Sequence, residues 1–495
     1  MQVGAANNEP RSDIYVNKLY YNQIVDPMLQ NLVPNSTNSS DMTNNFNIIQ
    51  AALDGGGVIN FPPGTYYVNA PLFAEVNETQ FIGAGIDLSV IKAGPEFSGD
   101  LFSISNSTTP VQYVTVKAIT FDGNAEAQTG SAGSCLMLIN AQNCLVDEVK
   151  CYCAKQEGIV ITTNGSQSFS NRISNCLVQY PVTHGIVLEG FTVTGKNADV
   201  YENIISNCAI TFCGGNGFYG FKASRCVLGN SVISRCNGTG LFFDNCYDCT
   251  SSNCTVNRSS VNGLGVVTCS GVCVRGCVIQ YSDQGNGGDY AVSLGASCTD
   301  GVFTNNIIVE DSTTTSDSQT GPNGVVYPAK TVTNSRGFNL NATASANLIQ
   351  SNYLSATVTT RFTGTGTYTN IVCDTSSTPT FYNQLNLTLS GVGLKMNSGL
   401  AMNIVTVTNG LYTATASDGI INVGGTGVAT VNLPDPSSFG KDGVVFIIKN
   451  TRSSAVTNYV TISAPSTIDG TTSAIINTDY GALRVYSVGS VYYSW

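Results

Sequence analysis

Between residues 158 and 267 the chain repeats a short pattern in which apolar and polar positions alternate after a glycine. The phrase reads EGIVI, HGIVL, NGFYG, TGLFF and NGLGV, with glycines at 158, 185, 217, 240 and 263. The glycines are separated by 27 (158 to 185), 32, 23 and 23 residues. Repeats of this length indicate a solenoid, and alternation with a period of two indicates strands. We therefore predict an all-β fold, a right-handed parallel β-helix in which each repeat forms one rung.

The alternation also predicts which side chains face the core. Residues one and three places after each glycine are almost all large and apolar, so they should point inward. Residues two and four places after it should point outward. The two outward columns are Val160, Val187, Tyr219, Phe242, Gly265 and Ser293, and Thr162, Glu189, Phe221, Asp244, Val267 and Gly295.

Cysteine follows the same periodicity. Of the 17 cysteines, 16 lie between Cys135 and Cys298. Buried thiols behave as small apolar side chains, so we expect stacked thiol columns inside the helix. Rungs about 4.8 Å apart would also allow disulfides, and thiols are favoured. Because CxxC occurs once and the sole histidine, His184, lies far from it in sequence, we predict no metal site and no cofactor.

The pattern divides the chain into four regions. Residues 1–39 form a leader, 40–375 the β-helix, 376–400 a linker or stem, and 401–495 a C-terminal β-rich domain, predicted to be a small β-sandwich or β-prism. A β-helix exposes sheet edges at its ends and needs caps. An apolar helical pattern that starts near Asp41, a plausible helix-capping residue type, predicts a capping helix at the N-terminal end.

The charge balance excludes several kinds of partner. Only 11% of the residues are charged, and the net charge is −11. An acidic protein is a poor ligand for nucleic acid and for anionic membranes. No apolar run reaches the ~18 residues of a membrane span. The N-terminus lacks a basic stretch followed by an apolar core, so we also expect no signal peptide.

Three segments carry a family resemblance. IIQAALDGGGVINFPPGTYYV (48–68), FIGAGIDLSVI (81–91) and ITFDGN (119–124) closely resemble the N-terminal part of the pectate-lyase-3 superfamily, which includes many phage tailspikes and virion depolymerases. The resemblance is specific over 45–125 and covers roughly 40–375 in architecture. It implies a capped right-handed β-helix, often trimeric, that binds or cleaves polysaccharide.

Both ends of the chain resemble viral fibre proteins. Residues 401–495 resemble their C-terminal domains, and DIYVNKLYYNQIVDP (13–27) resembles their short particle-attachment leaders. These resemblances imply a virion spike or tail-fibre-like protein, exposed on the particle surface and assembled as a homotrimer. They also imply a virion attachment protein as partner at the N-terminus and a host-surface polysaccharide as ligand. A free secreted pectinase of the plant type is disfavoured.

The outward columns predict the candidate site. Tyr219, Phe221 and Phe242 share one outer face with the carboxylates of Glu189 and Asp244, on three successive rungs. Aromatic faces can stack on sugar rings, and carboxylates can accept sugar hydroxyls or act on a glycosidic oxygen. The alternative is that this face is buried against another protomer or under a loop, since apolar outer patches often mark interfaces.

The spacing of the two carboxylates favours one mechanism if they are catalytic. Two rungs separate Glu189 from Asp244, which is ~10 Å between backbones. Inverting glycosidases hold their carboxyl groups roughly 6.5–9.5 Å apart and retaining ones about 5–5.5 Å. An inverting hydrolase is therefore favoured, with Glu189 as acid beside the apolar Phe221 and Val187 and Asp244 as base. The reversed assignment stays open.

The column before the glycines offers two further candidates, Glu157 and His184. THGIVLEG is similar to the GHG element of polygalacturonase-type glycosidases, but the aspartates which that family carries on preceding rungs are missing here. His184 is a catalytic base, a sugar ligand or a hydrogen-bonded turn residue. A polysaccharide lyase would need cations for a uronate, and Lys222, Arg225 and Arg235 lie nearby in sequence. The sequence leaves open a hydrolase, a lyase and a non-enzymatic structural or adhesive appendage.

Overall fold

A computed structural model describes most of the chain. The described residues are 27–128, 133–191, 193–194, 197–282, 290–309, 319–327, 336–341, 344, 347–354, 360–364, 370–374, 404–408, 410–415, 418–439, 444–453 and 455–495. The chain forms two compact units, Met1–Leu385 and Asn386–Trp495. Most of the predicted leader and all of the predicted linker at 376–400 lie outside the described residues.

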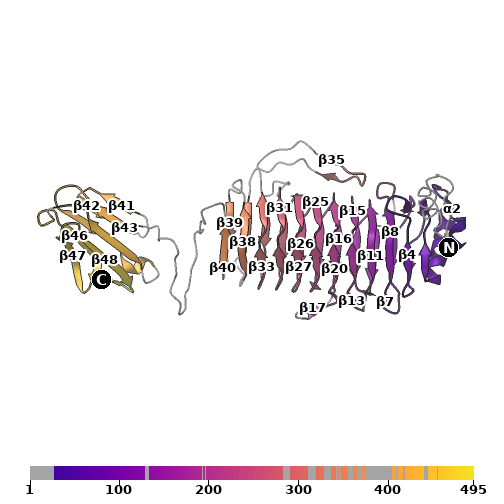
Figure 1. The fold of residues 1–495 in the computed structure, drawn as a ribbon, viewed down its shortest axis with the longest axis horizontal. Helices are drawn as coiled ribbons and strands as arrows, with labels where there is room; N and C mark the ends of the chain where they lie inside the picture. Colours follow the sequence, from indigo (N-terminus) through magenta and orange to yellow (C-terminus); the bar gives the residue numbers. More distant parts are fainter. Residues whose placement is uncertain are drawn as a thin grey trace, which may run out of the picture. The chain divides into compact units, whose positions relative to one another are not determined.

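A helix covers the N-terminal end of the stack of rungs, as predicted (Figure 1). The 3₁₀ turn η1 (Pro27–Asn31) precedes the helix α2 (Ser39–Gly55). The helix starts after Asn38, so Asp41 lies in its first turn and is not the N-cap. The buried amide of Asn45 accepts a hydrogen bond from the Val33 N–H at 2.8 Å and donates to the Tyr67 carbonyl at 3.2 Å. The helix thus protects the edge of the first rung.

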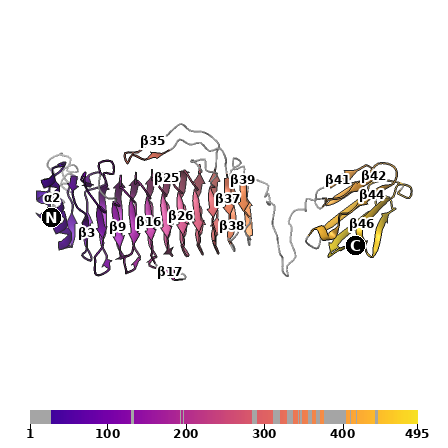
Figure 2. The same cartoon turned by 180° about the vertical axis from the view of Figure 1, so that it is seen from behind.

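Three parallel sheets form the walls of the β-helix (Figures 1 and 2). We call them sheets A, B and C. Sheet A contains β1 (Val58–Asn60), β2 (Gly64–Val68), β4 (Gln80–Ile82), β5 (Ser89–Ala93), β8 (Thr115–Asp122), β11 (Leu145–Tyr152), β14 (Arg172–Ser174), β15 (Leu177–Gln179), β20 (Ile204–Ser206), β21 (Ala209–Thr211), β24 (Val227–Gly229), β25 (Val232–Cys236), β27 (Thr250–Ser252), β28 (Thr255–Ser259), β30 (Cys273–Arg275), β31 (Val278–Gln280), β33 (Val302–Thr304), β34 (Ile307–Val309), β38 (Leu348–Leu354) and β40 (Asn370–Asp374).

The other two walls are shorter. Sheet B contains β3 (Leu72–Ala74), β6 (Phe102–Ile104), β9 (Leu136–Ile139), β12 (Ile159–Thr162), β16 (Ile186–Glu189), β22 (Phe218–Phe221), β26 (Leu241–Asp244), β29 (Leu264–Val267), β32 (Val292–Leu294), β37 (Arg336–Leu340) and β39 (Thr360–Gly364). Sheet C contains β7 (Val111–Gln112), β10 (Ala141–Gln142), β13 (Ser168–Phe169), β19 (Val200–Tyr201) and β23 (Ala223–Ser224). Two antiparallel hairpins leave the stack, β17 (Val193–Thr194) with β18 (Asn197–Ala198), and β35 (Gln319–Thr320) with β36 (Val326–Tyr327).

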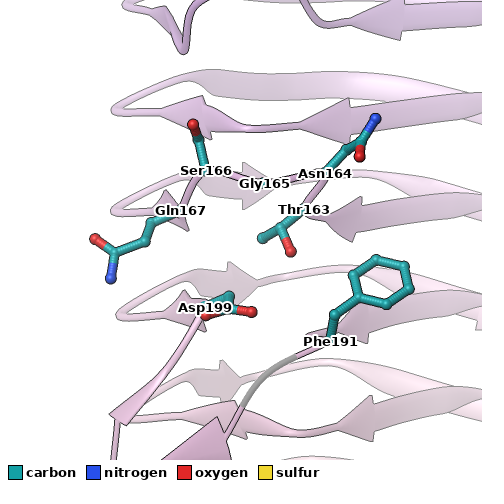
Figure 3. A pocket seen from close by; sticks show the side chains of 7 residues that line it. All are labelled: Thr163, Asn164, Gly165, Ser166, Gln167, Phe191 and Asp199. Atoms are coloured by element: carbon teal, nitrogen blue, oxygen red, sulfur yellow. The ribbon is translucent and has the colours of Figure 1, made fainter.

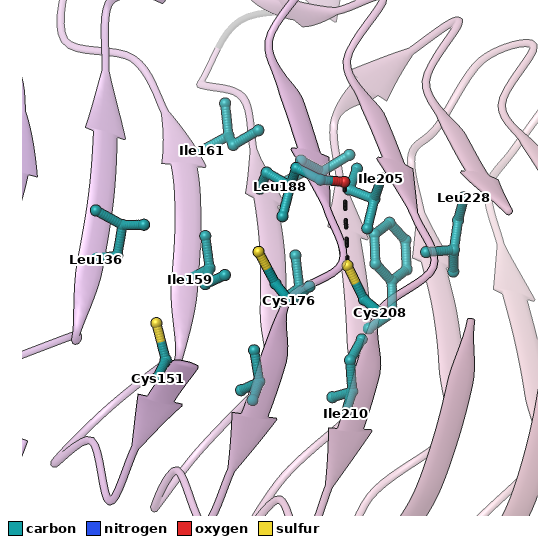
Figure 4. Packing of buried hydrophobic residues seen from close by; sticks show 14 of the residues in the cluster. Leu136, Cys151, Ile159, Ile161, Cys176, Leu188, Ile205, Cys208, Ile210 and Leu228 are labelled. Carbon is teal, nitrogen blue, oxygen red and sulfur yellow. Dashed lines mark hydrogen bonds between the residues drawn. The ribbon is translucent and has the colours of Figure 1, made fainter. Parts of the chain in front are cut away.

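The predicted inward columns form the core (Figure 4). Ile159 pairs in register with Ile186, and Phe218 pairs with Leu241. All four side chains are buried. The 16 cysteines from Cys135 to Cys298 are buried free thiols that stack between the apolar side chains, as Cys176 and Cys208 do on adjacent rungs. The phase of the repeat read from the sequence is therefore confirmed.

The repeated glycine is needed because two walls approach each other closely there. A Cβ placed on Gly217 would overlap the Cγ2 methyl of Ile233 in sheet A and would lie 2.8 Å from the carbonyl oxygen of Gly240 on the next rung. The other glycines of the column meet an aliphatic side chain of sheet A in the same way. A side chain at this position would push the two sheets apart.

The β35–β36 hairpin lies against rungs that come much earlier in the chain. The Tyr327 ring lies 5.2 Å from the Phe212 ring and 6.2 Å from the Tyr180 ring. The Asn323 amide donates to the Pro181 carbonyl at 3.2 Å. The hairpin therefore buttresses the turns that lead into β16 and β22 of sheet B.

The second unit is β-rich, as predicted, but its strands pair differently from a simple sandwich. It contains β41 (Ile404–Val407), β42 (Gly410–Thr413), β43 (Ile420–Val423), β44 (Ala429–Asn432), η2 (Pro436–Phe439), β45 (Val445–Asn450), β46 (Val460–Ile468), β47 (Thr471–Ile476), β48 (Ala482–Val488) and β49 (Val491–Ser494). β41, β43 and β45 pair in parallel, as do β42, β44 and β46, while β47, β48 and β49 add antiparallel pairs. Consecutive strands such as β41 and β42 therefore belong to different parallel series, as consecutive strands of a β-helix rung do. These strands surround a hydrophobic core that is separate from the core of the β-helix.

The glycine column yields a stability prediction. Gly217→Ala should lower the free energy of unfolding by about 1–3 kcal/mol, because the added methyl overpacks the contact with Ile233. Urea denaturation followed by circular dichroism measures the change. Gly55→Ala is the matched control, because no atom lies within 4 Å of the Cβ position. Equal stability of Gly217→Ala and the wild type would contradict the packing described here.

Candidate functional site

Strand register brings the predicted site residues onto one face of sheet B. Glu189 pairs with Phe221, and Phe221 pairs with Asp244. Tyr219 and Phe242 pair with each other in the neighbouring column. All five side chains point outward and are partly exposed within this chain. Glu189 and Asp244 are two rungs apart, as predicted.

The aromatic side chains form a continuous outer surface. The rings of Tyr219 and Phe242 are stacked with 5.4 Å between centroids and 12° between planes. The Phe221 ring lies 6.1 Å from that of Tyr219. Val160 and Val187, also outward in register, are only 4% and 5% exposed, so the column is accessible from Tyr219 onward. A half-exposed stack of this kind can receive the flat, apolar side of a ring.

Partial burial shifts the pKa of both carboxyl groups upward. Desolvation raises the pKa of Glu189, and the negative charge of Glu157 raises it further, while Lys222 opposes the shift. Desolvation also raises the pKa of Asp244, against a hydrogen bond from Asn245 at 2.9 Å and the charge of Lys222. Such shifts make a carboxyl group better able to deliver a proton near neutral pH.

Lys222 is the cation on this face, and its contacts fix its position. Its Nζ donates to the Phe191 carbonyl at 3.2 Å and lies 4.9 Å from the centre of the Phe221 ring. The two arginines considered for a lyase lie elsewhere. Arg225 pairs with Glu202 at 3.0 Å next to sheet C, and Arg235 in sheet A lies over the Phe212 ring. The cation cluster that a uronate would need is therefore not formed on sheet B by these three residues.

His184 and Glu157 belong to a polar ladder at the edge of the site. The backbone N–H of Asn216 donates to His184 Nδ1 at 2.8 Å, which leaves the proton of the neutral ring on Nε2. The His184 ring lies 5.2 Å from that of Tyr219. The Glu157 carboxylate accepts hydrogen bonds from the hydroxyls of Ser134 and Thr183, each at 3.0 Å. Both residues hold turns in place, and His184 also supports the aromatic stack.

Burial also affects the acid–base behaviour of two rings. It lowers the pKa of His184, partly offset by Glu157, and raises the pKa of Tyr219 to about 12. Both rings are therefore neutral at pH 7.

The sequence analysis missed the residues beside Glu189. The corner between sheets B and C is widened by residues 163–167 after β12 and by residues 190–199 after β16, whereas only Lys222 separates β22 from β23. The sequence feature that indicates these extra residues is the length of two glycine intervals, 27 and 32 residues, compared with 23 for the others. They show that two neighbouring rungs carry extra residues at this edge of the site.

The described part of the chain has neither a metal cluster nor a membrane-spanning helix. No three or more His, Cys, Asp or Glu side chains there are grouped so as to bind a metal ion. No helix in that part is long and apolar enough to span a membrane.

Comparison with known families identifies the architecture. Residues 35–286, a little over half of the chain, match the family model described as rhamnogalacturonase A/epimerase, pectate lyase-like. The matched range begins just before α2 and includes every candidate residue on sheet B. Among curated proteins, none matches the sequence.

Several solved structures are similar in fold. The enzymatically active domain of tailspike protein 2 from bacteriophage CBA120 has a TM-score of 0.47 at 13% identity, and the alignment covers 64% of this chain and 49% of that one. The mannuronan C-5 epimerase AlgE6 A-module of Azotobacter vinelandii has a TM-score of 0.42 at 14% identity, and the alignment covers 67% of this chain and 95% of that one. The surface protein and adhesin PfbA of Streptococcus pneumoniae has a TM-score of 0.43 at 12% identity, and the alignment covers 67% of this chain and 94% of that one. The chain thus spans about half the length of the tailspike chain.

Burial of the His184 ring yields a pH prediction. As its pKa is lowered in the folded protein, the unfolded chain takes up a proton first when the pH falls below about 6.5. The contribution of His184 to the free energy of unfolding is fully present above that pH. It is lost as the pH falls through the pKa that His184 has in the folded protein. Because His184 is the only histidine, NMR of histidine-labelled protein reports its titration without ambiguity.

The folded protein should show a ring pKa below 6.5, and the same protein in urea should show a value close to 6.5. A folded pKa equal to or above that of the unfolded chain would contradict the position assigned to the His184 ring.

Proposed function

The chain belongs to the rhamnogalacturonase A/epimerase family of pectate-lyase-like proteins, and we propose that the outer face of its sheet B binds a polysaccharide on a host cell surface. The observation that carries the proposal is the half-exposed stack of Tyr219 and Phe242 beside the carboxyl groups of Glu189 and Asp244. Aromatic faces with a few convergent polar groups are what a sugar chain requires of a binding surface.

We infer that the whole protein is a spike or tail-fibre-like protein on the surface of a virion. The resemblance of residues 13–27 to particle-attachment leaders and of 401–495 to viral fibre domains supports this assignment. In this arrangement residues 1–39 attach the chain to the particle, and the β-helix presents sheet B to the host.

We also infer that three copies assemble through the outer face of sheet A. Aliphatic side chains recur in two columns on that face, and Ile204, Val227, Val232 and Ile307 are 36–46% exposed in the single chain. Aliphatic side chains repeated along a regular stack can be covered by a second stack with the same rung spacing. Sheet B would then remain free for the polysaccharide.

The two carboxyl groups support hydrolysis with inversion. Glu189, whose pKa is raised by burial, would donate a proton to the glycosidic oxygen as the bond to the anomeric carbon breaks. Asp244 would take a proton from a water that attacks the same carbon from the opposite side. Their two-rung separation leaves room for that water. A lyase is less well supported, because Arg225 and Arg235 lie off this face.

The first test separates catalysis from binding. Glu189→Gln and Asp244→Asn should each reduce the release of reducing ends from a bound polysaccharide by roughly 10²–10⁴-fold, because each removes one proton transfer. Binding of the polymer should be unchanged. Reducing-end assays and co-sedimentation with purified bacterial surface polysaccharides measure the two quantities.

Other outcomes have defined meanings. Binding without release of ends by the wild type would identify a non-enzymatic adhesive appendage and exclude the hydrolase. Products with an unsaturated ring would identify a lyase. If no surface polysaccharide is bound at all, the proposed function is wrong.

The second test concerns assembly. Light scattering of the purified chain should give a mass three times the 51.9 kDa of one copy. Val232→Asp combined with Ile307→Asp should give a monomer, because charges would be buried in the contact. Leu88→Asp, at a more exposed position beside sheet A, should leave the mass unchanged. A monomeric wild type would contradict the inferred trimer.

A further inference from the structure

A small pocket lies directly beside Glu189, where two successive rungs widen (Figure 3). Residues 163–167 form one side, and Phe191 and Asp199 on the next rung form the other. Its volume is about 240 Å³, which is the scale of one sugar residue rather than of a folded ligand. Figure 3 shows Thr163 pointing toward the rung that carries Asp199 and Phe191.

The pocket lies close to the aromatic face in the strand register. Thr163 directly follows Thr162, which pairs in register with Glu189. Phe191 is two residues beyond Glu189 in the chain. A linear polymer that crosses the rungs from Phe242 past Glu189 would therefore reach this pocket next.

The backbone of the turn at 163–167 is held in place by the side chain of Asn140. The Asn140 Oδ1 accepts hydrogen bonds from the backbone N–H groups of Asn164 at 2.7 Å and Ser166 at 3.3 Å, and its amide donates to the Asn164 carbonyl at 3.1 Å. Gly165 between them has φ of +84°, a conformation that other residues rarely adopt. The side chains of Asn164 and Gln167 are exposed to solvent.

The opposite side of the pocket is fixed in a similar way. The Phe191 carbonyl accepts the hydrogen bond from Lys222, while its ring is 61% exposed. An exposed phenylalanine on an anchored backbone, facing amide and hydroxyl groups across a space of this size, is a platform for the apolar side of a sugar ring.

The charges around the pocket define the kind of sugar. Asp199 is the charged residue among those that line the pocket, and Glu189 lies two residues before Phe191. The Nζ of Lys222 is held by the Phe191 carbonyl and lies over the Phe221 ring. A uronate or phosphate group would meet like charges here, which is unfavourable at short range. Amides, hydroxyls and carboxylates are instead suited to the hydroxyl groups of an uncharged sugar.

We propose that the pocket with residues 163–167 on one side and Phe191 and Asp199 on the other is a subsite for one uncharged sugar residue of the polysaccharide that crosses sheet B. The proposal rests on the proposed function of that face and adds the chemical class of the sugar and a second point of attachment. It assigns Phe191 and Asn164 to binding rather than to catalysis.

The experiment measures binding of the full chain to an array of purified bacterial capsular polysaccharides and lipopolysaccharide O-chains, some uncharged and some bearing uronate or phosphate. The wild type should bind uncharged polymers. Phe191→Ala and Asn164→Ala should each weaken that binding about tenfold, as should Tyr219→Ala. Leu88→Ala, which removes an equally exposed apolar side chain beside sheet A, is the matched control and should bind as the wild type does.

The outcomes separate this proposal from the proposed function. If Tyr219→Ala weakens binding while Phe191→Ala and Asn164→Ala bind normally, the subsite is wrong and the function of sheet B stands. If the wild type binds only polymers with uronate or phosphate, the assignment of an uncharged sugar is wrong. If the wild type binds none of the polymers, the proposed function itself fails. Thermal unfolding of each variant shows whether a loss of binding reflects a loss of folding.

Discussion

The contact between the glycine column and the aliphatic side chains of sheet A determines the phase of the five rungs that carry the glycine. At Gly217 the two walls approach so closely that Ile233 occupies the space of a side chain. With the glycine fixed at this contact, the next residues alternate inward and outward in a set order. The outward positions of Glu189, Tyr219 and Asp244 are therefore a consequence of core packing. A functional face on such a fold is built by choosing side chains at positions that the core leaves free.

The same constraint explains why the site spans several rungs. One rung contributes only two outward side chains from sheet B, too few to hold a polymer. Parallel pairing places equivalent positions of successive rungs about 4.8 Å apart, so that Tyr219 and Phe242 stack and Glu189, Phe221 and Asp244 follow one line. A surface that extends along the stack in this way suits an extended ligand better than a compact one.

Much of this arrangement could be predicted from the sequence, and the remainder has identifiable physical reasons. The glycine phrases predicted the rungs, the buried thiols and the outward position of all five residues on sheet B, because alternation leaves little freedom. The alternation did not predict that Val187 is covered while Tyr219 is accessible, because the exposure of an outward side chain depends on what lies over its rung. Arg225 and Arg235 are close to Lys222 in sequence but lie on other walls, because each rung turns corners between sheets.

The position of loops was harder to predict than that of strands. The 27- and 32-residue intervals recorded extra residues, but only the structure shows that both insertions widen the same corner beside Glu189. The parallel pairing in the second unit was missed for a related reason. A short turn between alternating strands is compatible with a hairpin and with a corner, and the sequence from 401 to 495 does not distinguish the two.

A crystal structure of the protein with a bound oligosaccharide fragment of its host polymer tests the central claim most directly. The account predicts sugar density across the outer face of β22 and β26 and beside Glu189 at the end of β16, with one ring on the Tyr219–Phe242 stack. Density confined to the outer face of sheet A or to the second unit, with sheet B empty, would contradict it.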